Sequence, residues 1–444
     1  MTTATLAPPH TPPAVPAHRE STFLRYLGGQ AVSILGDQVW YVALSFSAVQ
    51  LASPGMAGVV LAVSALPRLV LLLFGGAIVD RYGPRRLMIG SDLARGAIAL
   101  VTAAVALAQP SVALLVVVAL AFGLADALFL PAAGSMLPRL LSPAQLTGGL
   151  ALSGLTARLA LTFGAPLGGL LLPIGGLPLA CLVNAATFAV SVLALWSVRP
   201  AAATGRDATD GVPARSAAPG EQALAGGMAS GNAAARVPIG AAVREGLRYL
   251  ARHRLLRAVT LVGLLVNLGA VGPLNVGLAL VAAERGWGAA GIGGMLAGFG
   301  IGSAAGNVLM MRWRPAGRLG LIVACCAVVQ CGALFAIAIA PLPAWAFAAT
   351  ALGGLAGGPQ AVLLNGLTHA YTADSHRGRV ASINNLANLG ITPLTMALMG
   401  FAAAQFGTVT AFAASAALIL AAAALCLTIP TLRHAHLPPT THRP

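Results

Sequence analysis

Long apolar stretches recur along nearly the whole chain, and short polar or arginine-bearing segments separate them. Each stretch can cross a hydrocarbon core of about 30 Å as a helix, and the alternation typical of barrel strands is not seen. Lipid offers no partner for backbone polar groups, so stretches of this length must be helical. The pattern predicts about twelve membrane spans, at residues 23–51, 55–79, 87–108, 111–137, 146–172, 176–198, 258–283, 288–311, 319–340, 343–368, 380–404 and 408–430.

An interruption between the sixth and seventh spans divides the spans into two sets of six. It is rich in Ala, Gly, Pro and Ser and cannot bury enough apolar surface to fold. Weak similarity between the sets, such as residues 164–167 and 390–394, favours two related halves. We therefore predict an all-α membrane protein of two pseudo-symmetric six-helix bundles. Its expected parts are a disordered tail at 1–22, a first bundle at 23–198, a flexible linker at 199–240, a second bundle at 241–430 that begins with an amphipathic helix, and a tail at 431–444.

The distribution of charge predicts an orientation. Only 8% of residues are charged, and most of the formal net charge of +15 comes from arginines in short segments on one side of the predicted spans. The positive-inside rule places these segments, the linker and both termini in the cytoplasm. The expected membrane is the inner or plasma membrane of the cell. Because the charge lies in loops between spans, it does not indicate nucleic-acid binding.

The loop between the second and third spans carries a motif. Residues 76–86 read Gly-Ala-Ile-Val-Asp-Arg-Tyr-Gly-Pro-Arg-Arg. They resemble the loop signature G-x-x-x-D-R-x-G-R-[KR] of the major facilitator superfamily, although Pro84 stands where a basic residue is usual. In that family the loop latches the two halves in one access state. The expected latch residues are Gly76, Asp80, Arg81, Gly83, Arg85, Arg86, Asp92 and Arg95.

A small-residue element lies in the fifth span. Residues 164–169 resemble the G-P-x-x-G-G element of exporters in this superfamily, with the proline one position late. Gly164, Pro166, Gly168 and Gly169 are expected to permit close helix packing and a bend, and ordinary small-residue packing is the alternative. Other stretches, including 129–133 and 377–382, resemble the branch that contains macrolide efflux proteins and siderophore exporters. The resemblance extends from about residue 23 to 430.

Ionisable residues within the predicted spans are functional candidates, because a charge in lipid must pair or face a cavity. We hypothesise that Asp37 binds a coupling proton and that Arg68 or Arg158 modulates it, since an approaching arginine changes the proton affinity of a carboxylate. A static buried ion pair is the alternative.

Three further charges have structural interpretations. Asp92 and Arg95, three residues apart, are expected to pair on one helix face. Asp126 either pairs with Arg81 as a conformational latch, which we favour, or joins a mid-membrane arginine at a proton site.

The spans of the second half carry amides in place of charges, and Gly272-Pro273 interrupts the seventh span. These neutral walls, with one aromatic residue of the first span, suggest a substrate cavity. The candidates are Trp40, Asn267, Asn275, Gln360, Asn365 and Asn388.

Several functional classes lack the residues that they need. The five cysteines fall within spans without metal-type spacing, and the chain has no lysine for a G-x-x-x-x-G-K-[ST] phosphate loop. No nucleophile and base stand out, so we expect no enzyme activity, cofactor or metal.

The resemblance implies a secondary transporter that exports amphipathic small molecules, drug-like or siderophore-like, by proton antiport with alternating access. The expected partners are the substrate, the proton and the bilayer, with the chain acting as a monomer. Two alternatives remain open: a lipid or lysophospholipid transporter, and a non-transporting membrane scaffold or sensor.

Overall fold

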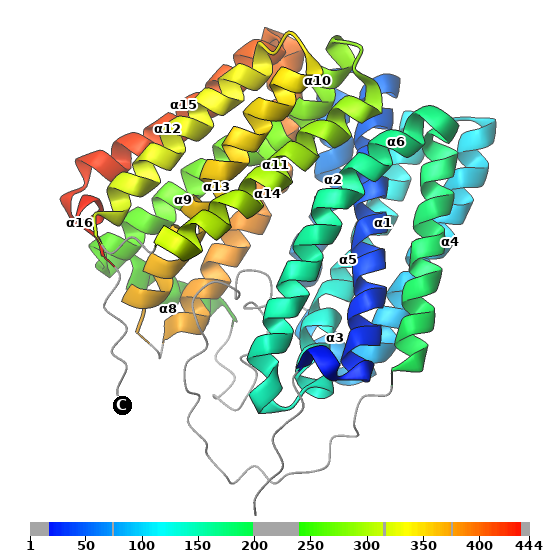
Figure 1. Ribbon diagram of the computed structural model, residues 1–444, viewed down its shortest axis with the longest axis horizontal. Helices are drawn as coiled ribbons and strands as arrows, with labels where there is room; N and C mark the ends of the chain where they lie inside the picture. The colour runs from blue at the N-terminus through cyan, green and yellow to red at the C-terminus, as the bar shows by residue number, and fades with distance from the viewer. Residues whose placement is uncertain (1–16, 73–74, 199–238, 314–316, 374–375, 437–444) are drawn as a thin grey trace, which may run out of the picture.

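The computed structural model describes residues 17–72, 75–198, 239–313, 317–373 and 376–436, and every regular element within these ranges is a helix (Figure 1). The elements of the first half are η1 (Ala17–Arg19), α1 (Ser21–Leu51), α2 (Pro54–Leu72), α3 (Gly75–Tyr82), α4 (Pro84–Ala108), α5 (Val112–Leu140) and α6 (Pro143–Ser197). Those of the second half are α8 (Ile239–Arg252), α9 (Arg254–Gly272), η2 (Pro273–Gly277), α10 (Leu278–Glu284), α11 (Gly288–Trp313), α12 (Leu319–Ala338), α13 (Pro343–Tyr371), α14 (Arg377–Phe406), α15 (Thr408–Thr428) and α16 (Pro430–Arg433).

The helices account for the predicted membrane crossings. Ten stretches are long and apolar enough to span a membrane, and one of them, residues 148–197 of α6, contains two crossings. The chain turns there at Gly176, whose φ of 62° is a conformation that favours glycine. The shorter apolar stretch 54–69 of α2, which α3 follows, supplies another crossing. Twelve crossings result, and the predicted all-α membrane fold is confirmed.

Helical order extends into both predicted tails. At the N-terminus, η1 and the first residues of α1 lie before residue 23. At the C-terminus, α16 follows the last span, and Leu319 N donates to Ala435 O at 2.9 Å. Residues 1–16, 437–444 and most of the predicted linker lie outside the described ranges.

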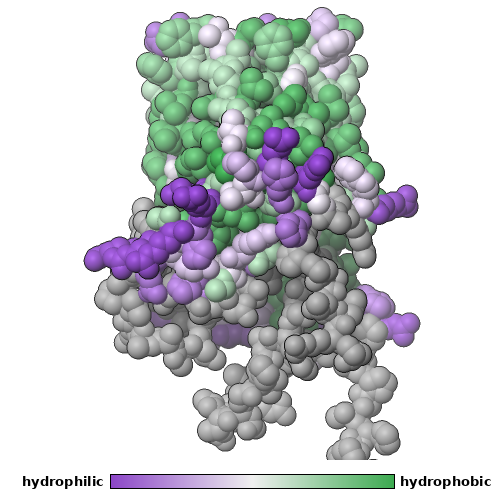
Figure 2. Space-filling view, turned by 90° about the vertical axis from the view of Figure 1, so that its left-hand side faces the viewer, coloured by the Kyte–Doolittle hydropathy of each residue, from purple (hydrophilic) through white to green (hydrophobic). Residues whose placement is uncertain are grey.

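The two ends of the molecule differ in charge. We call one end the arginine-rich end and the opposite one the far end. The far end holds the short connections between α1 and α2, α4 and α5, and α10 and α11. Figure 2, which views the second half, shows hydrophilic side chains gathered below a broad hydrophobic band. The exposed arginines that define the arginine-rich end include Arg86, Arg139, Arg254, Arg312 and Arg433.

The halves meet through α2 against α14 and through α6 against α11. Small residues bring these backbones together: a Cβ atom at Gly58 would lie 2.9 Å from Gly400 Cα, and one at Gly293 would lie 2.6 Å from Ala165 O. Gly58 lies near the start of α2 and Gly293 near the start of α11, both close to the far end. Close backbone packing of this kind stabilises helix pairs in lipid, where the hydrophobic effect contributes little.

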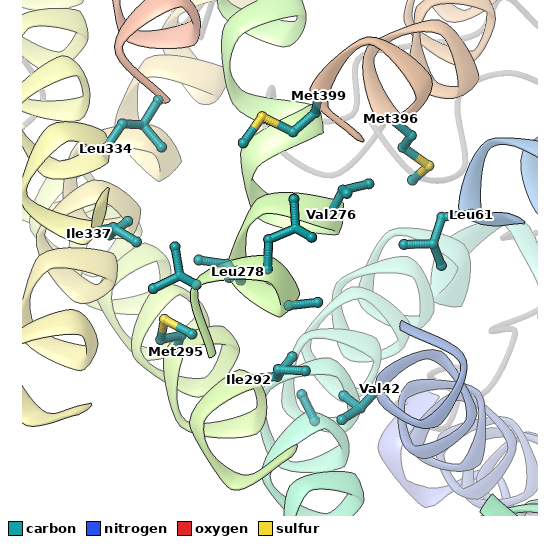
Figure 3. Close-up of a cluster of buried hydrophobic side chains, with 14 of the residues drawn as sticks. Val42, Leu61, Val276, Leu278, Ile292, Met295, Leu334, Ile337, Met396 and Met399 are labelled. Carbon is teal, nitrogen blue, oxygen red and sulfur yellow. The ribbon is translucent and has the colours of Figure 1, made fainter. Parts of the chain in front are cut away.

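Apolar side chains fill the seam beside these contacts. The largest buried cluster runs from Val42 and Leu61 of the first half to Val276, Ile292 and Met396 of the second (Figure 3). The two halves therefore share one dry core, and the described contacts between them concentrate toward the far end.

We predict that Gly293→Ala disturbs this seam, whereas Gly294→Ala does not. A Cβ atom at Gly293 would overlap Ala165 O, while one at Gly294 would meet nothing within 4 Å. Overpacking of this kind costs about 1–3 kcal/mol. Thermal unfolding in detergent should show a lower Tm for the first variant only, and equal Tm values for the two variants would contradict the packing described.

Candidate functional site

Five ionisable side chains from four helices meet inside the first half. They are Asp37 of α1, Arg68 of α2, Asp92 and Arg95 of α4, and Asp126 of α5. We call them the charge cluster. Each lies within a membrane-spanning helix, so each must find its electrostatic partners within the protein.

Arg95 lies at the centre of the charge cluster, with its side chain only 1% exposed. Its Nη1 atom lies 3.2 Å from Asp37 Oδ2 and 3.3 Å from Asp126 Oδ1. Its Nη2 atom donates to Asp92 Oδ1, which confirms the predicted pairing of these two residues on one helix face. One guanidinium thus joins three helices through charge-assisted hydrogen bonds.

Two aromatic rings lie against the Arg95 guanidinium. Its Cζ atom lies 4.3 Å from the ring centroid of Phe129 and 4.5 Å from that of Phe188. The buried Nε atom has no hydrogen-bond partner. Carboxylates and the π systems of these two rings therefore stabilise the buried cation together.

The three carboxylates differ in their access to solvent. The Asp92 side chain is 0% exposed and also accepts a hydrogen bond of 2.7 Å from Ser191 Oγ. Asp126 is 15% exposed and pairs with Arg68 as well as with Arg95. Asp37 is 31% exposed, the largest share of the three.

The charge cluster contains one more carboxylate than guanidinium. With all five groups ionised it would carry one uncompensated negative charge, which is expensive in a membrane interior. One bound proton would neutralise the excess. Asp37, the most exposed of the three carboxylates, is the candidate for that proton.

Two expected partnerships are wrong. Asp126 does not pair with Arg81, whose guanidinium lies 5.5 Å from the ring centroid of Tyr82; it pairs with Arg68 and Arg95. Arg158 is exposed on α6 and forms no ion pair within the described part of the chain, so it does not modulate Asp37. Arg95 holds Asp37 instead, because its side chain reaches past Asp92 toward α1.

The loop motif has a clear structural role at one residue. Arg85 Nε donates to Leu195 O and Arg85 Nη2 to Trp196 O, both at 2.9 Å, at the C-terminal end of α6. A cation at this position also complements the helix dipole. Gly83, with φ of 80°, forms the turn between α3 and α4.

The rest of the expected latch stays a prediction. Arg81 and Arg86 are exposed, whereas the surroundings of Gly76 and the side chain of Asp80 lie outside the described part. Within that part, Arg85 joins helices of the same half.

The small-residue element of α6 has two packing faces. A Cβ atom at Gly164 would lie 2.8 Å from Leu35 O, and one at Gly168 would lie 3.0 Å from Val39 Cα, both on α1. On the other face, a Cβ atom at Gly169 would lie 2.8 Å from Ala289 O on α11. The backbone of Pro166 borders the same α11 contact, because a Cβ atom at Gly293 would lie 3.1 Å from its Cα. At this element only the closely packed backbone of α6 lies between α1, which carries Asp37, and α11 of the second half.

Two cavity candidates lie inside the bundles. Trp40 is buried and stacks on Phe122, with ring centroids 4.6 Å apart. Gln360 is buried and accepts a hydrogen bond from Gln330 Nε2. In this structure both side chains face neighbouring helices of their own half, and their place in a substrate cavity stays a prediction.

Other amide candidates are more accessible. Asn267 Nδ2 donates to Asn388 Oδ1 at 2.9 Å and joins α9 to α14 at a partly exposed position. Asn365 is exposed on α13. These residues stay candidates for contact with a substrate.

Asn275 connects the two halves. Tyr41 Oη of α1 donates to Asn275 Oδ1 at 2.6 Å. Asn275 lies in η2, a π-helical turn, and its Nδ2 donates to Val271 O at 2.7 Å. Such widened turns are rare and frequently mark functional sites. Because Tyr41 follows Asp37 by one helical turn, this hydrogen bond brings the second half close to the charge cluster.

Twelve crossings within the described ranges, in two bundles with a charge cluster inside one of them, define a polytopic α-helical membrane protein. A family model described as Major Facilitator Superfamily matches residues 26–276 and 260–444, so the chain belongs to that superfamily. The chain is therefore a secondary transporter.

Solved structures share this fold. One is a bacterial homologue of the human lysosomal transporter Spinster, in an inward-facing and unoccupied conformation, with a TM-score of 0.63 and 14% identity over 93% of this chain and 96% of that one. Another is the human organic anion transporter MFSD10 (TETRAN), with a TM-score of 0.57 and 16% identity over 93% of this chain and 100% of that one. No curated protein matches the sequence.

We predict that Arg95→Gln strongly destabilises the protein, because three carboxylates would then share a single guanidinium. Loss of one partner of a buried ion pair costs about 3–5 kcal/mol. Unfolding in detergent should show this loss, and adding Asp92→Asn should restore part of it. The control Arg158→Gln removes an exposed arginine and should change stability by less than ~0.5 kcal/mol. Equal losses for Arg95→Gln and Arg158→Gln would show that the charge cluster is not as described.

We also predict that Tyr41→Phe weakens the contact between the halves by about 0.5–1.5 kcal/mol, the usual net value of one hydrogen bond. In a double-mutant cycle with Asn275→Ala, the two losses of stability should sum to more than the loss in the double variant. Once one partner of the hydrogen bond is removed, removal of the other costs less. Additive effects on Tm would argue against this hydrogen bond.

Proposed function

We propose that this transporter exports amphipathic small molecules, drug-like or siderophore-like, in exchange for protons. The observation that carries the proposal is Asp37, a partly exposed carboxylate bound to the buried Arg95 in a cluster with one excess negative charge. A site of this kind can accept a proton from water on one side and release it on the other.

Protonation would change how α1 is held. While Asp37 is ionised, it attracts Arg95 Nη1, which it shares with Asp126. Once Asp37 is protonated, the guanidinium can satisfy Asp126 and Asp92 alone, because each of these keeps its own nitrogen. Binding of a proton therefore loosens α1 from α4 and α5 without leaving a cation unpaired.

The loosened helix is also the one that borders the seam. Gly164 and Gly168 of α6 pack on α1, and Gly169 of α6 packs on α11. The helices α1 and α6 therefore connect the proposed proton site to the contact between the halves. Tyr41 adds a direct bond from α1 to the second half. We infer that proton release and closure of the far end are coupled through this contiguous packing.

The charges orient the molecule in the membrane, and the resemblance supplies the direction of transport. The positive-inside rule assigns the arginine-rich end, and with it both termini, to the cytoplasm of an inner or plasma membrane. The described contacts between the halves lie toward the far end, so this conformation is closed toward the outside. The resemblance of residues 164–169 to an exporter element supports efflux.

The second half offers the surface for varied substrates. Its amides at Asn267, Asn365 and Asn388 can bond to polar groups, while its apolar helices accommodate the rest of an amphipathic molecule. We propose that residues 76–86 latch the cytoplasmic end in the opposite access state. In this scheme one chain is sufficient for transport.

Proteoliposomes with an imposed pH gradient test the proposal. The probe is a fluorescent amphipathic dye, chosen from a panel because the wild-type protein transports it. Asp37→Asn should abolish transport driven by the pH gradient and keep downhill movement of the dye, since only the exchangeable proton is lost. Arg158→Gln is the matched control and should transport normally.

Gradient-driven transport by Asp37→Asn at the wild-type rate would reject Asp37 as the proton carrier. Wild-type transport that ignores the pH gradient would reject proton coupling altogether. Absence of any flux across the dye panel, with lysophospholipid moved instead, would favour the lipid alternative.

A further inference from the structure

Helix α8 carries a stripe of arginines that the charge cluster does not use. Arg244, Arg248 and Arg252 are spaced by four residues, so they lie on one face of the helix. All three are exposed, and none forms an ion pair with a residue that the structure describes. We call these residues the α8 stripe.

The acidic residue of α8 is directed elsewhere. Glu245 Oε1 lies 3.8 Å from His376 Nε2, in the connection that leads into α14. The α8 stripe therefore keeps its positive charge.

Contacts with the second half fix the position of α8. The Tyr249 ring stacks on His376, with centroids 4.3 Å apart and planes 13° apart, and Tyr249 Oη accepts a hydrogen bond of 3.1 Å from Ala373 N. Leu250 is buried in a small cluster with Val380 and Ile383 of α14. The helix is held on one side, so the arginines on its exposed side have a defined place on the molecule.

That place is the edge of the membrane. The chain breaks helical geometry at His253, with φ of −100° and ψ of 100°, and the candidate span 254–284 begins at the next residue. Arg254 and Arg257, at the start of this span, are also exposed. Figure 1 shows α8 at the lower end of the second half beside α14, at the level where Figure 2 shows hydrophilic side chains below the hydrophobic band.

We propose that the α8 stripe binds the head groups of anionic phospholipids in the leaflet at the arginine-rich end. Guanidinium groups pair with phosphate in a bidentate geometry, and a row spaced at about 6 Å can contact neighbouring head groups. Each basic residue near an anionic surface strengthens binding by several-fold. Zwitterionic head groups lack the net charge that this row complements. Because α8 is clamped to α14, bound lipid also anchors that end of the second half to the membrane surface.

Native mass spectrometry of the full-length protein in detergent tests the assignment. The probes are dioctanoyl phosphatidylglycerol, dioctanoyl phosphatidylcholine and inorganic phosphate. We expect phosphatidylglycerol to bind preferentially, and its affinity to fall with salt. The triple variant R244Q/R248Q/R252Q should bind it at least ~10-fold more weakly. The triple variant R244K/R248K/R252K should retain most binding, which separates loss of charge from loss of folding.

The control variant R139Q/R312Q/R433Q removes three exposed arginines that lie on separate helices at the same end. It should retain binding to within a few-fold. The proposal would be overturned if the protein bound the two lipids with equal affinity, or if the glutamine variant of the α8 stripe bound phosphatidylglycerol as tightly as the wild type. An equal loss of affinity in the control variant would overturn it as well. If inorganic phosphate displaced phosphatidylglycerol at an equal concentration, the site would be one for a free anion and not for a lipid.

Discussion

A guanidinium buried among lipid-facing helices must be surrounded by acceptors, and the first half is organised around this requirement. Arg95 obtains its acceptors from α1, α4 and α5, and Asp126 draws Arg68 of α2 into the same group. The rings of Phe129 and Phe188 also lie against the cation. Three crossing helices are thus joined by one side chain, and α2 joins them through the pair of Asp126 and Arg68.

The sequence predicts those features that depend on local spacing. Apolar lengths predict the crossings, and the interval of three residues predicts the pair Asp92 and Arg95. The centre of the charge cluster is not predictable in this way. Arg95 meets Asp37 and Asp126 from 58 and 31 residues away, so these contacts depend on how the helices face one another.

Side-chain facing also explains where the structure differs from these expectations. Trp40 and Gln360 have the polarity and depth expected of cavity walls, but each finds a partner in its own half, Phe122 and Gln330. Arg158 falls within a predicted span and yet is exposed on α6. A single sequence gives the depth of a residue in the membrane but not the direction in which its side chain points.

Different interactions hold the interior of the first half together and join the two halves at the seam. Within the first half, ion pairs specify the arrangement, whereas the seam relies on close glycine contacts, apolar side chains and the bond between Tyr41 and Asn275. Glycine contacts in lipid are individually weak, so the seam can separate while the interior of each half stays intact. Rigid halves joined by a weak seam are the mechanical requirement for alternation between two states of similar energy.

The widened turn η2 gives the seventh span a degree of freedom that a regular helix lacks. Asn275 Nδ2 binds Val271 O, the carbonyl that its own amide nitrogen would bind in an α-helix. The side chain thus donates to a carbonyl of α9 and at the same time accepts from Tyr41. A π turn holds one residue more than an α turn, so its conversion would rotate α10 against α9 by about 100° while both remain helical. Conversion of the π turn would therefore let the seventh span rotate about its own axis without unfolding in the membrane.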